Sequence, residues 1–175
     1  MTITNLTTMG EAEQELRDKI RAQLERIGED IPDTCYQCGK CTSGCEAMKL
    51  LELEPHHIMA MVKAGFIDEL INSDIIWTCV TCFKCKERCP QKAAPVEVLF
   101  LLKNMAVAQG KEIPINLSNM FQNVLSQGVV QMPLEARTRD GKGVKREELG
   151  LPELQSPKDP TKFQNVLMKL AMEEV

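Results

Sequence analysis

The sequence predicts an all-α protein. Several segments place apolar residues three or four positions apart, which is the period of an amphipathic helix, and no segment shows the alternation that is typical of a strand. Proline and glycine mark helix boundaries, as Pro55 and Gly65 do around residues 55–64. At 175 residues the chain has the length of one domain with an appendage, which is enough to bury a core without cross-links.

The first 30 residues predict an N-terminal helix over 9–28. Its apolar stripe recurs at steps of four, four and three, at Leu16, Ile20, Leu24 and Ile27. Thr8 and Glu11 have the spacing of a capping box, and Gly28 stands where a helix would end.

Composition and charge exclude several classes of protein. No apolar run approaches the length of about 18 residues that predicts a membrane span, and the N-terminus lacks the pattern of a signal peptide. We therefore expect a cytoplasmic chain with reduced cysteines. The net charge of −4 argues against a dedicated nucleic-acid binder.

The rest of the chain predicts further helices and one extended stretch. The helical segments are 46–53, 55–64, 66–72, 95–110, 117–125 and 161–172, of which 95–110 has one apolar face made by Val96, Leu99, Leu102, Met105 and Ala106. Glycine, proline and charge are concentrated in 128–160, which predicts an arm or linker. The expected domains are the N-terminal helix (1–30), a central domain (31–128) and an extended arm with a terminal helix for partner docking (129–175).

All the cysteines belong to two copies of one motif, C-x2-C-x2-C-x3-C. The first copy is Cys35, Cys38, Cys41 and Cys45, and the second is Cys79, Cys82, Cys85 and Cys89. A [4Fe–4S] cluster needs one thiolate for each of its four irons. Three cysteines at i, i+3 and i+6 can surround one face of a cluster, and the fourth thiolate must then come from elsewhere.

In two-cluster ferredoxins the fourth cysteine of each run binds the other cluster. The same arrangement here predicts two [4Fe–4S] clusters with crossed ligands. Cys35, Cys38, Cys41 and Cys89 would hold the first cluster, and Cys79, Cys82, Cys85 and Cys45 the second. Structural zinc prefers two pairs of cysteines separated by a dozen or more residues, and disulfides do not suit a reducing compartment. Zinc, disulfides and free thiols are therefore the weaker alternatives.

Two such clusters carry single electrons. With every thiol used as a ligand, none remains as a nucleophile, and no flavin or nicotinamide fingerprint occurs. We therefore expect an electron relay without catalytic residues of its own. Lys84, Lys86 and Arg88 in the second motif are either solvated helix ends or guides for a partner, and His56 and His57 are expected to be surface residues.

The segment from Cys35 to Cys45 (Cys-Tyr-Gln-Cys-Gly-Lys-Cys-Thr-Ser-Gly-Cys) and the segment from Trp77 to Pro90 together resemble an α-helical ferredoxin domain. Pro90 follows Cys89 as in the bacterial ferredoxin run, whereas Glu46 follows Cys45. Size, leading helix and C-terminal arm resemble the small iron–sulfur subunit of heterodisulfide reductase, which is the C subunit of that enzyme.

This resemblance implies a relay in methanogenesis. Electrons would pass from a flavin-containing iron–sulfur subunit to a cysteine-rich catalytic subunit that reduces the heterodisulfide of coenzyme M and coenzyme B. A hydrogenase or formate dehydrogenase would feed the assembly. Two alternatives stay open: a relay in another oxidoreductase (a sulfur-oxidising heterodisulfide-reductase-like system, or a glycolate or glycerol-phosphate dehydrogenase), and a structural zinc scaffold.

Overall fold

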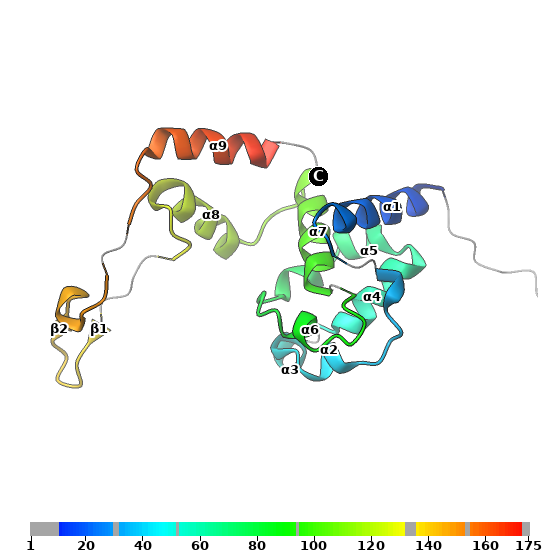
Figure 1. The fold of residues 1–175 in the computed structure, drawn as a ribbon, viewed down its shortest axis with the longest axis horizontal. Coiled ribbons are helices and arrows are strands. Elements are labelled where there is room, and N and C mark those ends of the chain that lie inside the picture. The colour runs from blue at the N-terminus through cyan, green and yellow to red at the C-terminus, as the bar shows by residue number, and fades with distance from the viewer. Residues whose placement is uncertain are drawn as a thin grey trace, which may run out of the picture. The chain divides into compact units, whose positions relative to one another are not determined.

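The computed structural model describes residues 11–29, 32–51, 53–93, 95–131, 136–152 and 155–172, and most of them are helical (Figure 1). The expected helical fold is therefore confirmed. The chain divides into two compact units, Met1–Glu112 and Ile113–Glu174. Among the helices that the structure describes, none combines the length and the apolar character that crossing a membrane requires.

Helix α1 (Glu11–Arg26) corresponds to the predicted N-terminal helix. Ile20 and Leu24 are buried as expected, but Ile27 is 54% exposed, because it lies beyond the last helical turn. Gly28 follows with a φ of 76°, a left-handed conformation that suits glycine at the end of a helix. The predicted cap at Thr8 lies outside the described residues.

Helix α7 (Pro95–Ala108) is the centre of the first unit and contacts α1, α4 (Pro55–Ala64) and α5 (Ile67–Ile71). The buried core comes from these helices and the segments between them, with Ile20, Leu24, Leu53, Met59, Val62, Leu70, Ile76, Leu99 and Leu102 among its members. Burying one such side chain stabilises the fold by about 1.5–3 kcal/mol. Helix α4 begins at a proline and ends at Gly65, as predicted.

The burial of α7 exceeds the prediction of a single apolar face. Its first turn is buried on all sides, including Glu97, and Lys103 is buried farther along the helix. Two charged side chains therefore lie inside the first unit, where each needs a polar partner.

Short helices connect the core to the cysteine motifs. Helix α2 (Lys40–Ser43) and helix α6 (Lys84–Glu87) lie within the two motifs and contact each other, and the sequence pattern did not predict them. A single turn is too short to show a period. The remaining short elements that the structure describes are η1 (Pro32–Thr34), α3 (Glu46–Leu51) and η2 (Asp74–Thr78) in the first unit and η3 (Glu147–Leu149) in the second.

In the second unit, α8 (Ile115–Gln127) packs against α9 (Pro160–Met172). The Gln164 side-chain amide donates to the Leu125 carbonyl at 2.9 Å. None of the described residues of this unit is buried, so its helices expose apolar side chains such as Ile115 and Leu170.

A small antiparallel hairpin corrects the expectation that the chain contains no strand. Strand β1 (Ala136–Arg137) pairs with β2 (Gly143–Val144), and Ala136 lies opposite Val144. Strands of two residues show no alternation, so periodicity cannot detect them. The signal that was present is the turn dipeptide Asp140-Gly141, in which Gly141 has a φ of 79°.

Candidate functional site

The eight cysteines surround two cavities in the first unit. The first cavity is lined by Cys35, Cys38, Cys41 and Cys89, and the second by Cys45, Cys79, Cys82 and Cys85. The first holds about 320 Å³ and the second about 330 Å³ of space without protein atoms, a volume that includes open solvent at each cavity. Each cavity therefore combines three cysteines of one motif with the fourth cysteine of the other.

The cysteines line the cavity walls and do not converge on one point. Within the described ranges, no three side chains of His, Cys, Asp or Glu gather closely enough to hold a single metal ion. A polynuclear group with one thiolate for each metal needs ligands that are spread around a cavity in this way.

The loops that carry the first three cysteines of each motif share positive φ angles at two equivalent positions. Gln37 and Thr81, at equivalent positions, have φ angles of 62° and 51°. Gly39 and Phe83, also equivalent, have φ angles of 72° and 61°, and a one-turn helix follows each of them. A bulky residue rarely adopts this conformation, so the conformation at Phe83 is held at a cost by its surroundings. The Phe83 ring packs beside Phe100, with 6.0 Å between ring centroids.

Burial also repeats between the motifs. The second cysteines, Cys38 and Cys82, are exposed, whereas the third, Cys41 and Cys85, are buried. Burial raises the pKa of the Cys41 thiol, and burial together with the charge of Cys79 raises the pKa of Cys85 to about 12. Such thiols stay protonated at neutral pH and are weak nucleophiles, and a bound metal is what converts them to thiolates.

The start of α7 lies between the two cavities. Pro95 lines the first cavity and Val96 the second. Val96 is fully buried in one apolar cluster with Cys41 and Cys85, which belong to different cavities. The two cavities are therefore neighbours, with buried side chains of both in contact with each other.

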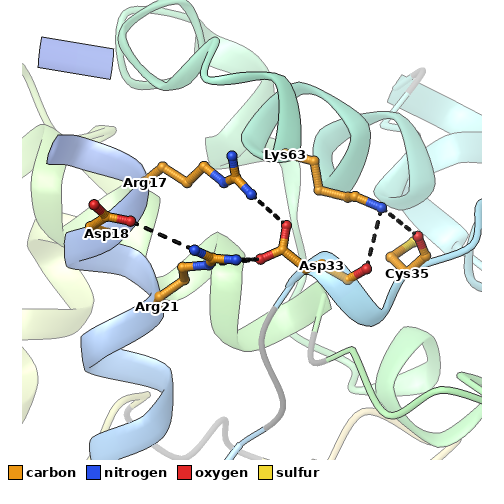
Figure 2. Close-up of polar contacts among 6 residues, drawn as sticks. All are labelled: Arg17, Asp18, Arg21, Asp33, Cys35 and Lys63. Carbon is orange, nitrogen blue, oxygen red and sulfur yellow. Dashed lines mark hydrogen bonds and ion pairs between the residues drawn. The ribbon is translucent and has the colours of Figure 1, made fainter. Parts of the chain in front are cut away.

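A charged network precedes the first motif (Figure 2). Arg17 and Arg21 of α1 both donate to the Asp33 carboxylate, each with one hydrogen bond of 2.7 Å. Partial burial raises the pKa of Asp33, but the bonds and charges of the two arginines outweigh it and hold that pKa below its usual range. The network fastens α1 to the residues that lead into Cys35.

Lysines from two helices hold the first cysteine of each motif. Lys63 of α4 donates to the carbonyls of Asp33, at 3.3 Å, and Cys35, at 2.9 Å (Figure 2). Lys103 of α7 donates to the Cys79 carbonyl at 3.2 Å. Burial lowers the pKa of Lys103, and the charge of Cys79 opposes that effect. Neither lysine was predicted as a site residue, although Lys103 interrupts the apolar face of its helix at i+4 from Leu99.

Two basic residues of the second motif form ion pairs within the chain. Lys84 forms an ion pair with Glu46, while Lys86 contacts Glu29, at 2.5 Å, and Glu97. The hydrogen bonds that Lys86 donates to the carboxylates of Glu29 and Glu97 raise the pKa of Lys86. These two lysines are therefore not simply solvated helix ends.

His56 corrects the expectation that both histidines are surface residues. It lines the first cavity, and its Nδ1 lies 2.6 Å from the hydroxyl of buried Thr42, the neighbour of Cys41. His57 is exposed, as expected. The sequence does not indicate which way a histidine near the start of a helix faces. It therefore could not distinguish the environment of His56 from that of His57.

Comparisons with known proteins identify similar iron–sulfur proteins. Residues 31–93 match the family model of a 4Fe-4S dicluster domain. The chain is 34% identical over 110 residues to the C subunit of the H(2):CoB-CoM heterodisulfide,ferredoxin reductase of Methanothermobacter thermautotrophicus, covering 63% of this chain and 57% of that protein.

Two further relatives carry similar names. One is the iron-sulfur C subunit of the CoB–CoM heterodisulfide reductase of Methanopyrus kandleri, 38% identical over 55% of this chain and 50% of that protein. The other is the C subunit of the ferredoxin:CoB-CoM heterodisulfide reductase of Methanosarcina mazei, 28% identical over 89% of this chain and 90% of that protein. The chain spans between half and three fifths of the length of the first two of these relatives. The resemblance to the small iron–sulfur subunit of heterodisulfide reductase is confirmed.

Proposed function

We propose that this chain is an electron-transfer subunit that binds two [4Fe–4S] clusters with crossed ligands. Cys35, Cys38, Cys41 and Cys89 hold the first cluster, and Cys45, Cys79, Cys82 and Cys85 hold the second. The observation that carries the proposal is the division of the cysteines between two cavities of nearly equal size. Each cavity offers four thiols, one for each iron of a cubane.

When bound, each cluster supplies one-electron redox chemistry. The residues of the chain set the conditions for that chemistry. Val96 and the buried thiols of Cys41 and Cys85 keep water from the wall between the cavities. The exposed Cys38 and Cys82 mark the places where each site approaches the surface, so that electrons can enter near one and leave near the other.

The chain performs no substrate chemistry in this proposal. All its thiols are ligands, and none is left to attack a disulfide. We therefore assign it the relay position in a heterodisulfide reductase complex, between a flavin-containing iron–sulfur subunit and the catalytic subunit that reduces the coenzyme M–coenzyme B heterodisulfide in methanogenesis. The names of the relatives support this assignment, and a hydrogenase or formate dehydrogenase completes the assembly.

The exposed apolar side chains of α8 and α9 support a docking role for the C-terminal part of the chain. Val166, Leu170 and Met172 are each more than half exposed. An amphipathic helix with an uncovered apolar face is a common element of subunit interfaces.

Iron and acid-labile sulfide analysis of the anaerobically purified chain tests the cluster proposal. We expect about eight iron and eight sulfide per chain. Two zinc ions without sulfide would instead identify a structural zinc scaffold. Proteins that copurify then test the complex: a cysteine-rich disulfide reductase supports the assignment, whereas a flavoprotein hydroxy-acid oxidase indicates a relay in a different oxidoreductase.

A further inference from the structure

Each cysteine motif begins at a residue whose carbonyl is held by a lysine from a core helix. The distance from Nζ to carbonyl oxygen is 2.9 Å for Lys63 and Cys35, and 3.2 Å for Lys103 and Cys79. The two cysteines hold the same place in the repeat, but their lysines come from different helices, α4 and α7. The structure therefore supplies an ammonium group at the same point of each cluster loop.

The two lysines lie in different surroundings. Lys103 is 9% exposed, and its Nζ lies 6.0 Å from the centroid of the Trp77 ring. In the part of the chain that the structure describes, no carboxylate forms an ion pair with it. Lys63 is only partly buried, and it also donates to the Asp33 carbonyl. A charge acts more strongly in a buried place than in one that water reaches.

Reduction adds one negative charge to an iron–sulfur cluster, so a cation nearby favours the reduced form. The net charge, hydrogen bonds and solvent exposure around a cluster are what set its potential within the wide range that proteins use. A lysine fixed to the main chain of a ligand combines two effects: it orients the loop, and it places a positive charge beside the cluster.

We propose that Lys63 and Lys103 are matched positioning residues for the two clusters, and that buried Lys103 raises the reduction potential of the second cluster more than Lys63 raises that of the first. This inference rests on the proposed binding of two clusters. It makes the second cluster the one whose potential depends on a single buried side chain.

The test uses the full chain, reconstituted anaerobically with iron and sulfide. Iron and sulfide are counted for each variant, and midpoint potentials are measured by redox titration followed by electron paramagnetic resonance. Cys38→Ser and Cys82→Ser assign the signals, because these residues belong to different loops. The variants are Lys103→Met, Lys103→Gln, which keeps an N–H donor without the charge, Lys103→Arg and Lys63→Met. Lys111→Met, at an exposed lysine beyond the end of α7, is the control.

We expect Lys103→Met and Lys103→Gln to lower the midpoint potential of the second cluster and to leave the first unchanged. Lys103→Arg should stay close to the wild-type value, and Lys63→Met should lower the potential of the first cluster by a smaller amount. Loss of only the second cluster in Lys103→Met, with recovery in Lys103→Arg, also supports the positioning role.

Three results would overturn the inference: an unchanged potential in a Lys103→Gln variant that retains its iron, equal shifts of both clusters, or a shift in Lys103→Arg as large as in Lys103→Met. A wild-type chain that takes up neither iron nor sulfide fails at an earlier step, because that result contradicts the proposed function itself.

Discussion

The side chain of Arg88 lies directly over Gly44. A Cβ at Gly44 would come within 2.8 Å of the Cδ of Arg88 and closer still to its Nη1. The two residues hold equivalent places in the repeat, since each precedes the fourth cysteine of its motif, Cys45 or Cys89. The two motifs therefore touch where each sends its last cysteine to the other cavity.

This contact predicts a coupled pair of substitutions. Gly44→Ala should lower the free energy of unfolding by about 1 kcal/mol, because Arg88 must move aside. In an Arg88→Ala background the same change should cost almost nothing. Gly44 has a φ of −106°, so its backbone adds no strain. Urea unfolding followed by circular dichroism measures both changes.

Gly39→Ala is the matched control. Gly39 has a φ of +72°, and apart from its chain neighbours no atom of the described residues lies within 4 Å of the position that a Cβ would take there. Backbone strain should make Gly39→Ala lower the free energy of unfolding by about 1–2 kcal/mol, and Arg88→Ala should not reduce this loss. If the costs at Gly44 and Gly39 respond alike to Arg88→Ala, the contact does not explain the glycine at position 44.

The proposed crossed ligation predicts which cluster each fourth cysteine supports. Cys45→Ser should damage the cluster held mainly by 79–85, and Cys89→Ser the cluster held mainly by 35–41. Electron paramagnetic resonance of each variant, with Cys38→Ser and Cys82→Ser as references, measures the loss. Damage confined to the first cluster in Cys45→Ser would mean that each motif binds its own cluster.

Lys86 is predicted to stabilise the fold through a buried partner. Glu97 is 7% exposed, and its Oε2 has no hydrogen-bond partner among the described residues. Lys86→Met leaves that carboxylate without its cation and should lower the free energy of unfolding by about 2–3 kcal/mol. Adding Glu97→Gln should restore much of the loss.

Lys84→Met is the comparison for this pair. Lys84 pairs with Glu46 at the surface, where both side chains are about half exposed. Its loss should have little effect on urea unfolding, because exposed ion pairs contribute little. Equal effects of Lys84→Met and Lys86→Met would contradict the role given to Glu97.

The lowered pKa of Asp33 predicts that the stability of the fold depends on pH. Its pKa is lower in the folded chain than the usual value of 3.8, so the unfolded chain binds the proton more readily. The stabilisation is therefore fully present above the usual carboxyl range and is lost as the pH falls through the folded pKa. Asp33→Asn should cost about 1–2 kcal/mol at pH 7 and progressively less in acid.

Thermal unfolding under argon, from neutral to acidic pH, checks this dependence. The curves of wild type and Asp33→Asn should converge in acid. Asp18→Asn is the control, since Asp18 lies 3.7 Å from Arg21 with a 58% exposed side chain and should show little difference at any pH. A constant difference between wild type and Asp33→Asn would exclude the carboxylate charge as the cause.

The division of the chain predicts that a version ending at Glu112 keeps both clusters. Every cysteine and every residue that lines the two cavities belongs to the first unit. We expect unchanged iron content and weaker copurification with partner subunits. Loss of iron on truncation would show that α8 and α9 support the cluster sites.

The sequence determined most of the helices and the cysteines that line the two cavities. Proline and glycine bounded α4, and apolar periodicity located α1, α7 and α9, because both signals act over a few neighbouring residues. The doubled motif pointed to every cysteine that lines the cavities. The prediction that Ile27 belongs to the apolar stripe was wrong, and the short hairpin was not predicted. Both lie at a helix end or a turn, where periodicity is weakest.

Only the tertiary structure decided what surrounds the cysteines. Lys63 and Lys103 are distant in sequence from the carbonyls that they hold, and Gly44 meets Arg88 across the repeat. His56 and His57 are adjacent, yet of the two only His56 lines one of the cysteine-lined cavities. A local pattern records which residues share a helix face, whereas these partners depend on how helices from separate parts of the chain pack together. The cysteines of the candidate site could therefore be identified from their spacing in the sequence. The charged residues around them could be identified only from the tertiary structure.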